Sequence, residues 1–111
     1  MKIELVEKFT LNNRICAITK ATFSILFSWH NGYIELLDGE VKDSYNDYPN
    51  VAENLTYQGH GNYFNNDETK TFIGFDTNHY YNRRNPSSQT PQAVLYTILQ
   101  TIKELENAQP R

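Results

Sequence analysis

Hydrophobic and β-branched residues alternate with polar residues over the first third of the chain, and a period of two is typical of β-strands. Four segments carry this pattern: residues 2–9, 14–19, 22–28 and 33–36. The third segment is also short enough to form a helix, but its β-branched and aromatic content favours a strand. The asparagine pair Asn12-Asn13 and the Asn-Gly pair in His30-Asn31-Gly32 predict hairpin turns between strands.

The middle of the chain is polar and rich in turn-forming residues. Residues 38–54 are predicted as loop, and two further strands are expected at 54–57 and 70–76. Residues 77–89 after the last strand are polar, and we predict a loop and a linker there.

The last third of the chain predicts one long amphipathic helix that ends near residue 107. Thr90 is a good N-cap, and Pro91 occupies the first helical position, where proline is preferred. Apolar residues then recur three and four positions apart and form a stripe on one side: Val94, Leu95, Ile98, Leu99, Ile102 and Leu105. A single helix cannot bury such a stripe alone. We therefore predict an α+β fold, a small antiparallel sheet packed with one long C-terminal helix.

Length and composition fit one domain with its own core. The chain has 111 residues, 39% of them hydrophobic and 14% aromatic. No apolar run approaches the roughly 18 residues of a membrane span, and residues 1–5 lack the apolar stretch of a signal peptide. We therefore expect a cytoplasmic protein with no membrane partner. The net charge of −3 argues against general nucleic-acid binding.

The single cysteine, Cys16, excludes an intrachain disulfide and a thiolate metal cluster. It lies in a predicted strand on the face opposite Ile15, so a small buried hydrophobe is the favoured interpretation. A catalytic nucleophile is the alternative, and no neighbouring histidine supports it.

Residues 71–79 contain the densest candidate chemistry. An apolar strand ends in Asp76 and His79, and tyrosines and the pair Arg83-Arg84 follow at once. A rigid strand that delivers polar side chains to a loop is typical of binding and catalytic sites. The tyrosine and asparagine content of the middle region also resembles that of antibody binding loops. We predict a ligand site formed by Tyr57, Phe75, Asp76, Asn78, His79, Tyr80, Arg83 and Arg84.

Acid–base or metal chemistry at this site is an alternative interpretation. It would use Asp76 and His79, with His60 as a third group. Residues three apart on an extended chain point to opposite faces, so a turn is needed to bring the pair together. The spacing matches no zinc pattern. His30 has no partner in the sequence and is interpreted as structural.

The order of short motifs resembles a family of small phage-borne proteins. Their pattern runs Gly-Tyr-Val-x-Val, Tyr-Asp-Asp, Val-His-Gly-Gly-Leu-Thr-Phe and Trp-Ile-Gly-Phe-Asp-x-x-His, followed by a C-terminal helix. The matching segments here are residues 32–36, 45–47, 55–59 and 73–79. The resemblance covers about two-thirds of the chain, from roughly residue 32 to residue 105. The family histidine falls on Ala52, and its two glycines fall on Glu53 and Asn54. Loss of that histidine favours binding over catalysis.

The resemblance implies an anti-defence role in an infected host cell. By analogy, Thoeris anti-defence-type proteins sequester a cyclic ADP-ribose signal in β-rich oligomers, although this chain does not match them residue by residue. We therefore predict that the protein binds a nucleotide-like signal, cyclic ADP-ribose or a cyclic nucleotide, without turnover and without a metal or cofactor. In this hypothesis Arg83 and Arg84 pair with phosphates, Tyr57, Phe75 or Tyr80 stacks on the base, and Asp76 and Asn78 contact ribose.

Two other functions remain open from the sequence. A protein inhibitor of a host defence complex, similar to an anti-CRISPR, would use the same aromatic surface, with carboxylates between residues 38 and 47 as nucleic-acid mimics. A small phosphodiester hydrolase would use His60, Asp76 and His79. We also expect self-association, because a small domain with many exposed aromatic residues gains by burying them.

Overall fold

A computed structural model describes residues 1–48 and 55–108. Its strands are β1 (Lys2–Leu11), β2 (Arg14–Ser24), β3 (Phe27–Leu36), β4 (Tyr57–Gly59) and β5 (Thr71–Asp76). The helices are η1 (Tyr45–Asp47), α1 (Tyr80–Arg84), η2 (Pro86–Gln89) and α2 (Pro91–Asn107). The family motif position at Ala52, Glu53 and Asn54 lies outside the described residues.

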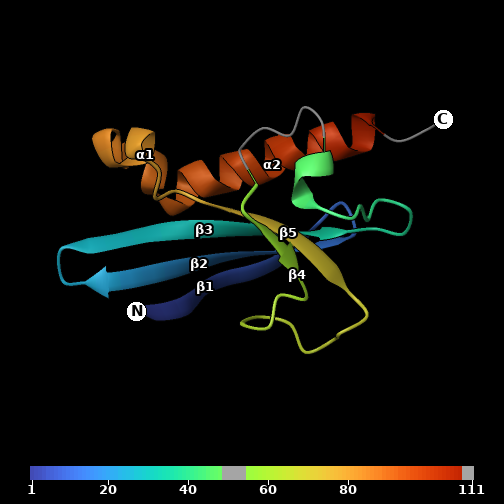
Figure 1. Cartoon of the computed structure of the whole chain (residues 1–111), viewed down its shortest axis with the longest axis horizontal. Coiled ribbons are helices and arrows are strands. Elements are labelled where there is room, and N and C mark those ends of the chain that lie inside the picture. Colours follow the sequence, from blue (N-terminus) through green and yellow to red (C-terminus); the bar gives the residue numbers. More distant parts are fainter. Residues whose placement is uncertain (49–54, 109–111) are drawn as a thin grey trace.

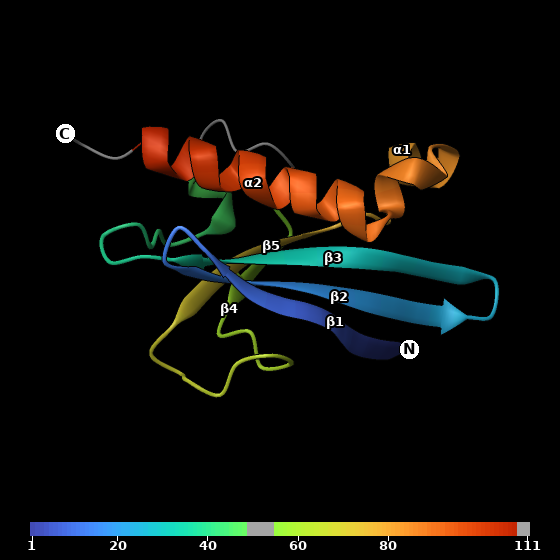
Figure 2. The ribbon, with the colours of Figure 1, turned by 180° about the vertical axis from the view of Figure 1, so that it is seen from behind.

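The strands form one antiparallel sheet in the order β1-β2-β3-β5-β4. Long α2 lies across one face of this sheet, so the predicted α+β class is confirmed (Figure 1). Figure 2 shows the same two layers from behind, with the β2–β3 hairpin extending past the rest of the sheet at one end. Within the described ranges, no helix is long and apolar enough to cross a bilayer.

The first predicted turn is confirmed and the second is wrong. Asn12 and Asn13 have φ of 50° and 64°, the left-handed conformation that a tight hairpin turn requires. Asn31 and Gly32, by contrast, lie inside β3, and the chain turns at Ile25 and Leu26 instead. Gly32 serves packing: a Cβ there would lie 2.5 Å from Cζ of Phe75. An Asn-Gly pair can therefore report close packing rather than a turn.

The main core fills the space between the sheet and α2. It contains Ile18, Ile34, Ile73, Phe75 and Ile98, all at most 2% exposed. The predicted helix stripe is confirmed with one shift. Val94, Ile98, Thr101, Ile102 and Leu105 are buried, whereas Leu95 and Leu99 remain partly exposed at 38% and 46%.

A smaller cluster lies on the opposite face of the sheet. Its buried members are Ala17, Phe64 and Phe72, and Tyr33 and Tyr57 pack against them. The rings of Tyr33 and Tyr57 meet edge to face with centroids 5.3 Å apart. This cluster fixes short β4 and the loop before β5 against the sheet.

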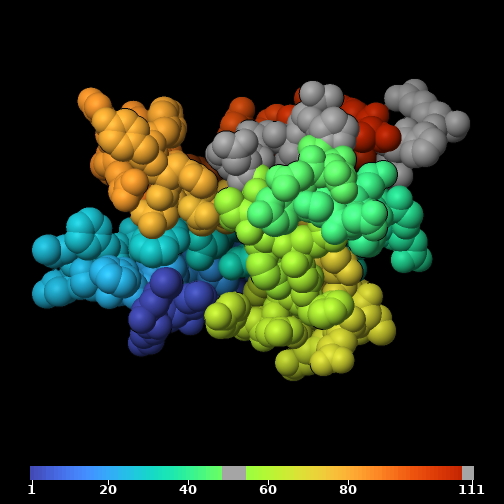
Figure 3. Space-filling view, viewed as in Figure 1, coloured from blue at the N-terminus to red at the C-terminus, as the bar shows by residue number. Residues whose placement is uncertain are grey.

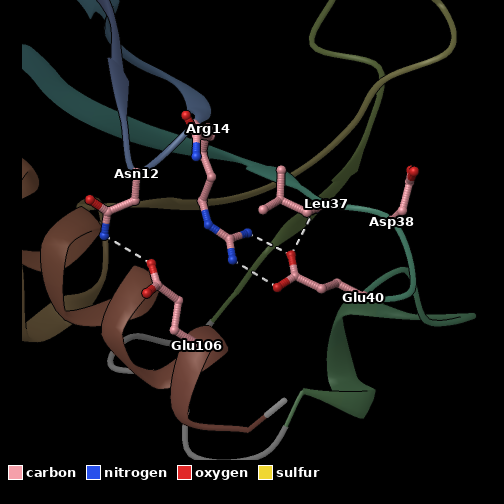
Figure 4. Close-up of a pocket in the computed structure, with 7 residues that line it drawn as sticks. Asn12, Arg14, Leu37, Asp38, Glu40 and Glu106 are labelled. Atoms are coloured by element: carbon pink, nitrogen blue, oxygen red, sulfur yellow. Dashed lines mark hydrogen bonds and ion pairs between the residues drawn. The ribbon is translucent and has the colours of Figure 1, made fainter. Parts of the chain in front are cut away.

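A buried ion pair joins the start of β2 to the loop after β3. Arg14 donates to both carboxylate oxygens of Glu40 at 2.5 Å and 2.7 Å, and the two side chains are only 1% and 3% exposed (Figure 4). Glu40 also accepts the backbone N–H of Leu37 at 2.7 Å. Burial by itself would lower the pKa of Arg14, but the hydrogen bond and charge of Glu40 outweigh it and raise that pKa.

Candidate functional site

The segment after β5 turns sharply because its own side chains form the turn. Asp76 Oδ1 accepts the backbone N–H of Asn78 at 2.9 Å, the usual Asp turn, and its Oδ2 accepts the Thr56 hydroxyl at 3.2 Å. The hydroxyl of Thr77 donates to the carbonyl of His30 at 2.7 Å. These bonds hold residues 76–78 beside β3, beyond the end of the regular sheet.

Further hydrogen bonds attach α1 and η2 to the same place. His30 Nδ1 lies 2.7 Å from the carbonyl oxygen of Gln89, so Nδ1 carries the proton in that bond. Gln89 in turn donates its amide to the carbonyl of Thr77 at 2.7 Å. Buried Asn82 donates to the Ser88 hydroxyl at 2.9 Å. The predicted loop is thus an ordered, helical segment, and the structural interpretation of His30 is confirmed.

An aromatic groove lies between this segment and the β2–β3 hairpin. It has a volume of about 320 Å³, at the lower end of the range for small-molecule sites. We call this cavity the aromatic groove. It is lined by Phe23, Phe27, Trp29, Asn78 and Arg83. Figure 3 shows the orange atoms around α1 standing beside the cyan atoms of the hairpin, the two elements that supply the lining.

The groove offers polar groups that are free to bind. Among the described residues, the guanidinium of Arg83 makes no hydrogen bond or ion pair, and the side-chain amide of Asn78 makes none either. Arg84 differs: it donates to the Tyr80 hydroxyl at 2.8 Å, and its guanidinium carbon lies 5.6 Å from the centroid of the Tyr80 ring. The two adjacent arginines therefore do not act as a pair.

The structure brings only some of the eight predicted site residues together. Asn78 and Arg83 line the groove, while Asp76 and His79 lie beside it and shape the turn. His79 Nε2 is 3.5 Å from Asp76 Oδ1, within ion-pair distance, but the geometry does not make a hydrogen bond. Tyr80 and Arg84 engage each other on the exposed side of α1.

Two predicted residues lie away from the groove. Phe75 is 2% exposed in the main core, because alternation along β5 points it toward α2. It cannot stack on a ligand from there, so this expectation is wrong. Tyr57 belongs to the cluster on the other face, where its hydroxyl accepts the backbone N–H of Gly61 at 2.9 Å. It too is turned away from the groove.

The third group proposed for catalysis is far from the other two. His60 follows Gly59, which pairs with Phe72, and Phe72 is four residues from Asp76 along β5. That offset corresponds to roughly 13 Å along the strand. Within residues 1–48 and 55–108, no cluster of three His, Cys, Asp or Glu side chains could hold a metal.

The lone cysteine is inert in this fold. Cys16 is fully buried in the main core, as the favoured interpretation predicts. Burial raises the pKa of its thiol to about 12, so the nucleophilic thiolate is absent near neutral pH.

Sequence reasoning missed the aromatic side of the groove. Phe23, Phe27 and Trp29 belong to a segment that the sequence identifies only as an apolar strand. The sequence did contain a signal: this segment has more aromatic residues than a small core can bury. In the structure Phe23 and Phe27 accordingly remain 67% and 56% exposed.

A second, more polar cavity lies at the opposite end of the sheet. It has a volume of about 590 Å³ and lies around the Arg14–Glu40 ion pair (Figure 4). Asn12 donates to Glu106 across it at 2.8 Å. Arg14, the only cation that lines it, is already paired with Glu40, so the cavity offers no free cation to an anionic ligand.

Comparisons with known proteins identify no relative. No family model, no curated protein and no solved structure matches the chain.

Proposed function

We propose that the protein binds and sequesters a small nucleotide-like signal in the aromatic groove and does not turn it over. The observation that supports this most is the combination of three aromatic side chains with the free guanidinium of Arg83. Aromatic faces stack on nucleobases, and guanidinium groups bind phosphate oxygens. With the resemblance to small phage-borne proteins, this supports an anti-defence role.

The split of the arginine pair narrows the ligand class. Only Arg83 lines the groove, while Arg84 is engaged by Tyr80. One guanidinium fits one phosphate better than a pyrophosphate. We therefore rank a cyclic mononucleotide above cyclic ADP-ribose, which the sequence favoured equally.

Capture without turnover is favoured by the layout of the titratable groups. Asp76 is engaged in the turn, His79 Nε2 lies 3.5 Å from it without a hydrogen bond, and His60, which follows β4, lies far from both. A hydrolytic mechanism would need a general base and a second catalytic group at the same phosphate.

Trp29, the only tryptophan, reports on the groove directly. Its fluorescence is titrated with cyclic mononucleotides, cyclic dinucleotides and ADP-ribose isomers, and calorimetry checks each binder. Loss of one charge-assisted contact costs about 1.5–3 kcal/mol, so Arg83→Ala should weaken binding roughly 10- to 100-fold. The ligand recovered after denaturation should be intact.

Arg84→Ala is the matched control, because it removes the same charge from the next residue outside the groove. It should leave affinity within about threefold of wild type. Equal losses for the two variants, or no binding by any member of the panel, would refute the proposal. Recovery of hydrolysed ligand would restore the hydrolase alternative.

A further inference from the structure

The tip of the β2–β3 hairpin is apolar and uncovered. Hairpin turns usually carry glycine, asparagine or aspartate. Here the two turn residues are Ile25 and Leu26, which are 95% and 83% exposed, and Phe23 and Phe27 flank them. The hairpin projects at one end of the molecule, beyond α1 and the start of β1 (Figures 1 and 2). An apolar projection of this kind marks a docking surface.

Residue types change in a regular order from the tip toward the body. Aliphatic Ile25 and Leu26 come first, and phenylalanines come next. Trp29 follows, three residues behind Leu26 on β3, which corresponds to roughly 10 Å. Aliphatic groups partition into acyl chains, whereas tryptophan prefers the interface between acyl chains and headgroups. The order matches the depth profile of a lipid monolayer, into which interfacial elements insert about 5–10 Å.

Basic residues surround the hairpin behind its tip. Lys20 pairs in register with His30, Lys2 pairs with Thr22, and Arg83 lines the groove beside Phe27. One carboxylate lies among them: Glu4 is opposite Lys20 in the register and 3.7 Å from Lys2, so the three cations outnumber it. This local excess of positive charge favours approach of the tip to an anionic surface.

We propose that the hairpin tip docks on an anionic lipid surface, with Ile25 and Leu26 inserted among the acyl chains, which departs from the expectation of no membrane partner drawn from the sequence. Lys2, Lys20 and Arg83 face the lipid phosphates. A projecting apolar tip with basic residues behind it suits a lipid surface, because the tip can contact acyl chains while the basic residues attract the lipid phosphates. Ile25 and Leu26 do not line the aromatic groove, so their substitution tests lipid docking separately from ligand capture, although Arg83 and the aromatic residues of the groove take part in both proposals.

Vesicle co-sedimentation of the full chain tests this proposal. The vesicles are phosphatidylcholine alone, or phosphatidylcholine with about a third phosphatidylglycerol. We expect binding to the anionic vesicles that weakens as salt rises, because exposed charges are screened. Leu26→Asp should lower the partition coefficient about tenfold or more, since it replaces a membrane-buried leucine. Lys20→Gln should lower it roughly fivefold.

Matched controls lie elsewhere on the surface. Val41→Asp makes the same type of change at a site that is 52% exposed in the loop after β3, and Lys103→Gln removes a positive charge from α2. Both should bind like wild type. Circular dichroism confirms that each variant is folded, and Ile25→Asp repeats the test at the other turn residue.

Several results would overturn the proposal. These are no sedimentation of wild type with anionic vesicles, equal binding to neutral vesicles, or unchanged binding of Leu26→Asp and Ile25→Asp. Analytical ultracentrifugation without lipid adds a further test. A dimer that both tip variants dissociate would assign the tip to a second copy of the chain instead.

Discussion

Replacing Glu40 by glutamine should destabilise the protein strongly, because it leaves Arg14 charged and buried without its counter-charge. Both side chains are almost fully buried, and the guanidinium makes two charge-assisted hydrogen bonds to the carboxylate. Breaking a buried ion pair from one side costs about 3–5 kcal/mol. A domain of this size is stable by only about 5–15 kcal/mol, so the loss is a large share of the total.

Urea and thermal unfolding, followed by far-ultraviolet circular dichroism, measure the loss. The midpoint of thermal unfolding should fall by at least about 12 °C. The double variant Arg14→Met/Glu40→Leu should be more stable than Glu40→Gln, because it removes both charges and leaves apolar side chains of similar size.

Glu4→Gln is the matched control. Glu4 lies 3.7 Å from Lys2 in an exposed pair, so the same chemical change should cost less than about 1 kcal/mol. If Glu40→Gln were no more destabilising than Glu4→Gln, the Arg14–Glu40 pair would contribute nothing specific to the fold and this reasoning would fail.

Four further predictions concern the core and α2. Gly32→Ala should cost about 1–3 kcal/mol in urea unfolding, because the new methyl group would collide with the Phe75 ring; an unchanged midpoint would contradict the close approach. Cys16 should react with a thiol reagent only after unfolding. The raised pKa of Cys16 also means that its protonated thiol stabilises the fold below pH 9. That contribution should fall by about 1.4 kcal/mol per unit as pH rises from 9 toward 12, and Cys16→Ala should lack this slope. Thr90→Ala should cost about 1 kcal/mol, because Thr90 Oγ1 accepts the N–H of Ala93 at 3.2 Å, whereas Thr10→Ala in exposed β1 should cost less.

Local signals predict much of this fold from the sequence. Thr90 and Pro91 define the start of α2, and Asn12-Asn13 forms the first turn, because each of these residues acts on the backbone within three residues of itself. The second turn could not be predicted, because Ile25 and Leu26 are not residue types that favour turns. Gly32 misleads, since its role depends on Phe75, which lies far along the chain.

The site is predicted less completely than the fold, for a related reason. The position of Arg83 after the last strand is visible in the sequence, and the structure places it in the groove. Its separation from Arg84 depends on Tyr80, one helical turn before Arg84. The aromatic partners come from a hairpin about fifty residues earlier. Contacts at such a separation depend on strand register, which a single sequence does not reveal.

The edge strand β1 carries a register shift that has a consequence for assembly. β1 forms one edge of the sheet, and its pairing with β2 is interrupted between Leu5 and Glu7. An uninterrupted edge strand of ten residues would present a regular row of N–H and C=O groups as a template for another chain. The bulge breaks that row and reverses the facing of side chains beyond it. A second strand could pair regularly with only half of β1, so the fold protects its own edge against strand addition while leaving the hairpin tip exposed.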